Sequence, residues 1–110
     1  MTSKVRVNMF PCDNKSEIEV QSTDDGNYVV KVTSTCKKAE RFVEGLGLLS
    51  LTDLIDKKES KIFRDFVASE MSANCLILSG VVTAAWVEAG MIARSVAKKG
   101  VPLSIEFVES

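Results

Sequence analysis

The chain has 110 residues and a mass of 12.0 kDa, a length at which one domain over residues 1–110 is expected. Its 45% hydrophobic and 26% charged residues are typical of a globular protein and exclude an intrinsically disordered one. Fourteen basic and fifteen acidic residues give a net charge of −1, so the basic excess of nucleic-acid-binding proteins is absent and no nucleic-acid partner is expected. The lack of histidine removes the commonest general base and the commonest metal-binding nitrogen.

The first ten residues, MTSKVRVNMF, contain no apolar run of the kind that a secretory signal requires, so we predict a cytoplasmic protein. Residues 75–93 carry one charged side chain, Glu88, and approach the length of a membrane-spanning helix. Ser79 and Thr83 interrupt this apolar run, and a helix of this kind also occurs in protein cores. We therefore predict a helix buried in protein and no membrane partner.

Three N-terminal segments alternate apolar and polar residues, which predicts strands over 4–10, 16–22 and 28–34. Turn-forming residues separate them, at 11–14 and at 23–27. Strands in this order, joined by short turns, predict an antiparallel meander.

Helical periodicity follows the third strand. Apolar residues recur at helical spacing from about residue 36 to 46, and again over 59–71. A long helix over about 75–98 is expected next, with Gly100 ending it. Residues 101–107 then alternate again and predict a last strand, whereas 48–55 fit either a helical turn or a short extended piece.

The predicted order is β-β-β-α-α-α-β. It favours a two-layer α+β domain in which a four-stranded mixed sheet carries helices on one face. In the last strand, Leu103, Ile105 and Phe107 are expected to point inward.

The three cysteines, Cys12, Cys36 and Cys75, are odd in number and contain no CxxC pair, so they are not a disulfide framework. Following the chain up and down the predicted sheet places all three at one end of the molecule. Cys36 and Cys75 are each expected at a helix N-terminus, where the helix dipole stabilises thiolate. Three thiolates at one edge predict a metal site that could hold Zn²⁺ or an iron–sulfur cluster.

The alternative is that the cysteines are core residues, because free cysteine often behaves as a small buried hydrophobe. For Glu88 two interpretations also stay open. It lies either on an exposed helix edge, or in the interior with a cation such as Arg94 or Arg41 or with a raised pKa.

Three short motifs, Pro11-Cys12-Asp13, Ser34-Thr35-Cys36 and Asn74-Cys75, resemble a family of small uncharacterised three-cysteine proteins from anaerobic archaea and bacteria, classed as a domain of unknown function. The resemblance covers nearly the whole chain. Members of that family tend to have prolines after the third cysteine, where this chain has Leu76-Ile77-Leu78. The resemblance implies the three-cysteine site but no activity.

Three functions are compatible with this sequence. The first is binding of a metal ion or iron–sulfur cluster by Cys12, Cys36 and Cys75. The second is a non-catalytic interaction or self-associating module, which uses an exposed edge strand or helix face and has cysteines as core residues. The third is an enzyme with Cys36 as nucleophile, in which a lysine or carboxylate would have to replace the missing histidine base.

Overall fold

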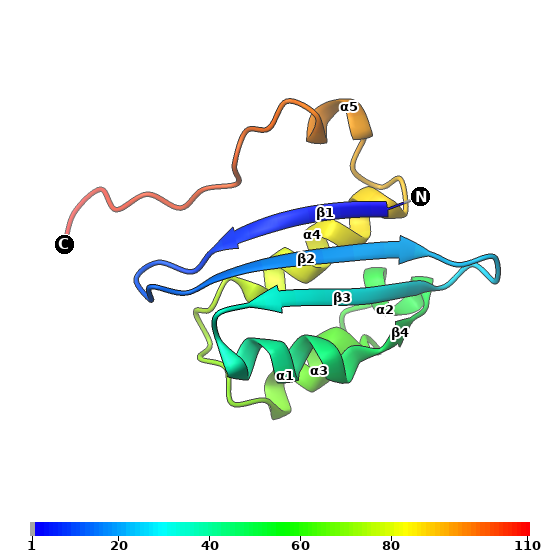
Figure 1. The fold of residues 1–110 in the computed structure, drawn as a ribbon, viewed down its shortest axis with the longest axis horizontal. Helices are drawn as coiled ribbons and strands as arrows, with labels where there is room; N and C mark the ends of the chain where they lie inside the picture. Colours follow the sequence, from blue (N-terminus) through cyan, green and yellow to red (C-terminus); the bar gives the residue numbers. More distant parts are fainter. Residues whose placement is uncertain (1) are drawn as a thin grey trace.

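An antiparallel meander forms the N-terminal part of the fold, as the alternating residues predict. The computed structural model describes residues 2–110, and its first strands are β1 (Thr2–Asn8), β2 (Lys15–Ser22) and β3 (Tyr28–Ser34). The strand order in the sheet is β1-β2-β3-β4, and every neighbouring pair is antiparallel. Figure 1 shows the strands side by side, with helices behind the sheet.

The register of the strands separates one buried face of the sheet from one open face. Ile18 of β2 lies opposite Val5 of β1 and Val32 of β3, and these apolar residues face the helices. The other face is polar and carries a cross-strand ion pair of 3.1 Å between Arg6 and Glu17. The sheet therefore has helices on one face, as predicted.

The helix α1 (Lys37–Leu46) follows β3 and buries the predicted apolar stripe, namely Ala39, Phe42, Val43 and Leu46. Gly47 then takes a φ of 58°, which favours glycine, and the chain turns back into β4 (Leu48–Leu49), which pairs with β3. The helix α2 (Leu51–Ile55) comes next, and Ser50 and Asp53 form its capping box. Residues 48–55 thus contain both a short strand and a helical turn.

Three further helices complete the chain. α3 (Lys61–Ala68) packs on α1, and Phe66 meets Phe42 edge to face with a centroid distance of 5.5 Å. α4 (Ile77–Glu88) crosses behind β1 and β2, and α5 (Arg94–Ala97) follows (Figure 1).

The predicted single helix over 75–98 is wrong. α4 ends at Glu88 because Gly90 adopts a φ of 80°, a left-handed conformation that ends a helix. The chain therefore changes direction before α5, and the order of elements is β-β-β-α-β-α-α-α-α.

The predicted last strand and the mixed sheet are also wrong. The fourth strand is β4, and within residues 2–110 the segment 101–110 forms no helix or strand. Pro102 lacks the N–H that a strand would use, and the backbone hydrogen bonds of the described chain stop at Gly100. Leu103, Ile105 and Phe107 are consequently exposed rather than inward-facing.

The core lies between the sheet and the helices α1, α3 and α4. Its centre is fully buried and includes Ile18, Val20, Leu46, Ile62 and Val81. Among residues 2–110 there is no helix that combines the length and the apolar character needed to cross a membrane.

Candidate functional site

The three cysteines come from segments that lie at the same end of the sheet. Cys12 is in the turn between β1 and β2, Cys36 precedes α1, and Cys75 lies in the loop before α4. Figure 1 shows these three connections together at the end of the sheet where β1 and β3 finish. Following the chain direction through the sequence thus predicted the correct end for each segment.

The surroundings of Cys75 make its thiol a weaker acid, because they raise its pKa. Burial raises the pKa of Cys75, and the charges of Cys36 and Cys12 raise it further, whereas a hydrogen bond from the backbone N–H of Ile77 acts in the opposite direction. The net effect keeps the Cys75 thiol protonated. The prediction of a helix N-terminus that favours thiolate at Cys75 is therefore wrong, because burial outweighs the local N–H donor.

All three cysteines are free, and they differ in exposure. Cys12 is exposed, while Cys36 and Cys75 are half-buried and pack against the core. Over residues 2–110, no three side chains from histidine, cysteine, aspartate or glutamate are arranged to hold a metal ion. The cysteines thus share an end of the molecule without a ready-made set of metal ligands.

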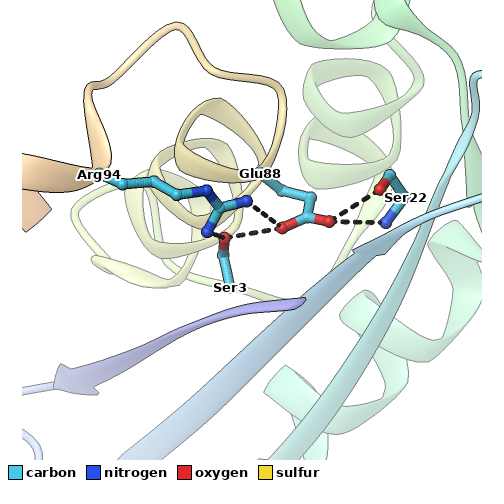
Figure 2. A network of polar contacts seen from close by, with 4 residues as sticks. All are labelled: Ser3, Ser22, Glu88 and Arg94. Atoms are coloured by element: carbon cyan, nitrogen blue, oxygen red, sulfur yellow. Dashed lines mark hydrogen bonds and ion pairs between the residues drawn. The ribbon is translucent and has the colours of Figure 1, made fainter. Parts of the chain in front are cut away.

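Glu88 is the centre of a buried polar network (Figure 2). Its Oε1 accepts hydrogen bonds from Ser3 Oγ at 2.8 Å and Arg94 Nη2 at 2.9 Å. Its Oε2 accepts from the backbone N–H and the hydroxyl of Ser22, both at 2.9 Å. Burial alone would raise the pKa of Glu88, but these donors outweigh it and lower the pKa to about 2.

The exposed-edge interpretation of Glu88 is wrong, and pairing with Arg94 is confirmed. The carboxylate connects the end of α4 to β1, β2 and α5, and every buried polar side-chain atom in the described chain has a hydrogen-bond partner. A carboxylate with all its acceptor positions used in this way is structural, because none is left to receive a substrate proton.

A groove runs between β1 and α4, and we call it the β1 groove. β1 is the last strand of the sheet on this side, and α5 and the start of the 101–110 segment form the opposite wall. The groove has a volume of about 580 Å³. Its lining consists of β1 residues 3–8, a stripe of α4 with its preceding residue, and residues from α5 onward; the α4 stripe is Leu76, Ser79, Gly80, Thr83 and Val87.

Every charged side chain that lines the β1 groove is a cation. These residues are Lys4, Arg6, Arg94 and Lys98. Arg94 is held in place by Glu88, and the Lys98 side chain is exposed to solvent. Lys4 and Arg6 both pair with Glu17, at 4.0 and 3.1 Å. The groove therefore combines an apolar lining with one exposed lysine, Lys98, at its rim.

Sequence reasoning missed the β1 groove, although one signal for it is present. On α4, Ser79, Gly80 and Thr83 interrupt the apolar surface at helical spacing. Gly80 lets α4 pack closely on β1, while Ser79 and Thr83 beside it remain at least partly exposed along the groove. The pattern indicated where the helix is less apolar. It did not indicate that the predicted strand at 101–107 would not form, which leaves the edge of β1 without a further strand.

Comparison with protein families gives one match. The profile of a family of unknown function (DUF6951) matches residues 3–100. The chain belongs to this family. The matched range ends at Gly100, so it includes all three cysteines and the network around Glu88 but excludes the 101–110 segment. No curated protein and no solved structure matches the chain.

Membership of DUF6951 bears out a resemblance to a family of unknown function. A three-cysteine signature and an anaerobic origin stay predictions for this family member.

Proposed function

We propose that this DUF6951 protein is a non-catalytic interaction module that binds an extended peptide segment in the β1 groove. The observation that supports the proposal is the position of the groove, which lies directly along the free edge of β1. An unpaired edge strand offers N–H and C=O groups to another extended chain, and addition of a strand is a common way to bind peptides.

The lining of the groove defines the kind of peptide that fits. Alternate side chains of an added strand would point toward the α4 stripe, where Leu76 and Val87 supply apolar contacts beside the exposed Ser79. The remaining side chains would lie near the rim, where the exposed Lys98 favours acidic groups. The preferred ligand is thus an extended segment in which apolar and acidic residues alternate.

The fully satisfied Glu88 argues for a binding role rather than a catalytic one. Catalysis by a carboxylate needs a lone pair or proton available to the substrate, and the pKa of about 2 keeps Glu88 ionised with its donors around it. Its contribution to the groove is to position Arg94, which lines one wall.

The test is a binding titration with the full chain at low concentration. The probe is a fluorescein-labelled ten-residue peptide that alternates valine with glutamate, and its control alternates valine with lysine. We expect the glutamate peptide to bind more tightly than the lysine peptide, and increasing salt to weaken its binding.

Two matched variants locate the binding site. Ser79→Trp places a large side chain in the β1 groove, whereas Ser72→Trp adds the same side chain at an exposed position outside it. The proposal predicts at least tenfold weaker binding for S79W and unchanged binding for S72W. Equal affinities of S79W, S72W and the natural chain would overturn it.

A second candidate function is binding of a thiophilic metal ion, Zn²⁺ or the iron of an iron–sulfur cluster, by Cys12, Cys36 and Cys75. The position of the three cysteine-bearing segments at the same end of the sheet supports it. Among residues 2–110 no three potential ligands are arranged to hold a metal ion. The turn that carries Cys12 would therefore have to move toward Cys36 and Cys75 before the three could bind one ion.

The cysteine hypothesis has its own measurement. Anaerobic titration with Cd²⁺ should produce an ultraviolet thiolate-to-metal absorption band with a stoichiometry of one ion per chain. Each single Cys→Ser substitution should reduce the affinity by at least tenfold. A band that persists unchanged in C12S would show that the three cysteines do not act together.

A further inference from the structure

The 101–110 segment exposes an unusual amount of apolar surface. Its large apolar side chains are between 76% and 90% exposed, and they are Val101, Leu103, Ile105, Phe107 and Val108. Contiguous apolar surface of this kind marks an interaction site in soluble proteins. The sequence also alternates, with Ser104 and Glu106 between the apolar residues.

The segment does not cover the groove of its own chain. Val101, Pro102 and Leu103 lie at the wall of the β1 groove, and the Phe107 ring meets Phe10 beyond the end of β1 at 6.2 Å. Figure 1 shows the segment running from α5 past the end of β1. Among the described residues no backbone hydrogen bond joins the segment to β1, and its large apolar side chains are at least 76% exposed. Within one chain, the first residues of the segment thus border the groove, whereas residues 104–110 do not line it.

The groove and the segment are complementary in the pattern of their residues. An extended strand whose apolar residues are Leu103, Ile105 and Phe107 has the pattern that the free edge of β1 and the α4 stripe would accept. Glu106 and Glu109 carry the charge that the exposed Lys98 at the rim of the groove favours. The segment lies outside the 3–100 range that the family profile matches, whereas most of the groove lining lies inside it.

We propose that two copies of this chain associate by exchanging their 101–110 segments, each segment binding as an added strand in the β1 groove of the other copy. The inference rests on the proposed function, because it names the peptide that the groove binds. Reciprocal exchange closes the assembly at two copies, since each copy then has its one groove and its one segment occupied.

Single variants test the two halves of the contact. Ile105→Asp puts a charge on the apolar side of the segment, and Ser104→Asp puts the same charge on its other side. Ile105 is 83% exposed, so I105D leaves the folded core unchanged. We expect light scattering to give twice the chain mass for the natural protein and S104D, and the mass of one chain for I105D and for S79W.

Mixing gives the decisive result. I105D retains an intact groove, and S79W retains an intact segment, so an equimolar mixture of these two monomers should form a heterodimer through one segment–groove contact. A mixture that stays monomeric would overturn the exchange. Dimeric I105D would overturn it as well, because association would then use another surface.

The outcomes also separate this inference from the proposed function. I105D has a free groove, so its binding of the valine–glutamate peptide reports on the groove alone. Peptide binding by I105D together with a monomeric natural chain would overturn segment exchange and retain the interaction module. Failure of I105D to bind the peptide would contradict the proposed function itself.

Discussion

Arg94 and Glu88 form the contact that ties the end of the helical layer to the sheet. Arg94 Nη2 donates to Glu88 Oε1 across 2.9 Å, and the side chain of Glu88 is fully buried while that of Arg94 is 33% exposed. Ser3 and Ser22 bring β1 and β2 to the same carboxylate. Because Arg94 also lines the β1 groove, this contact fixes the position of one groove wall.

Glu88→Gln should destabilise the fold by about 2–3 kcal/mol, since charged hydrogen bonds are lost and the amide N–H₂ would oppose the donors Ser3 and Arg94. The matched control is Glu17→Gln. Glu17 pairs with Arg6 on the open face of the sheet, where an ion pair contributes about 0–1 kcal/mol. Urea unfolding of both variants measures the difference. Equal losses would contradict a special role for the buried network.

The same carboxylate predicts a loss of stability in acid. The folded-state pKa of about 2 lies below the ordinary value of 4.5, so the stabilisation is complete above about pH 4.5 and decreases as the pH falls toward 2. The lowering corresponds to roughly 3 kcal/mol at neutral pH. Unfolding free energies measured between pH 6 and pH 2 should fall less steeply for Glu88→Gln than for the natural chain. Asp53, whose pKa is also lowered, accounts for part of the slope that remains.

Gly80 of α4 allows the helix to lie directly on the sheet. A Cβ at this position would overlap the side chain of Val7 and come within 3.0 Å of Ile18 Cδ1. Gly80→Ala should therefore destabilise the protein by about 1–3 kcal/mol, despite the better helix propensity of alanine.

Gly45 provides the matched control for Gly80. It lies in α1, and no atom is within 4 Å of the position of an added Cβ. Gly45→Ala should raise stability by up to about 1 kcal/mol. Thermal unfolding of both variants tests the difference. A stabilising G80A would mean that α4 is not packed on β1 and β2 as closely as described.

Elements that the local residue pattern determines could be predicted from the sequence. Elements that depend on where the chain turns or which strand it pairs with could not. The first three strands and α1 follow from alternation and helical spacing, whereas the pairing of Glu88 with Arg94 was only one of several interpretations that the sequence left open. The boundary of α4 was missed because Gly90 lies within an apolar run that continues past it. The last strand was predicted from the alternation of Leu103, Ile105 and Phe107. Alternation indicates that a segment can form a strand, but it does not identify the strand with which the segment pairs.

The thiols should differ in their rate of alkylation. Cys12 is exposed and should react fastest with iodoacetamide, whereas half-buried Cys75, with its raised pKa, should react slowest at neutral pH. In a C12S/C36S double variant the reactivity of Cys75 should shift to lower pH, because two nearby charges that disfavour its thiolate are removed. Peptide mapping by mass spectrometry measures each rate. An unchanged pH profile for Cys75 would contradict the proximity of the three sulfurs.

The most direct test of the interaction module is a map of backbone amide chemical shifts. ¹⁵N-labelled I105D, whose groove is free, is titrated with the unlabelled valine–glutamate peptide. The account predicts shifts concentrated in β1 and along the side of α4 that carries Ser79, Gly80 and Thr83. Shifts confined to the open polar face of the sheet, or no shifts at saturating peptide, would contradict it.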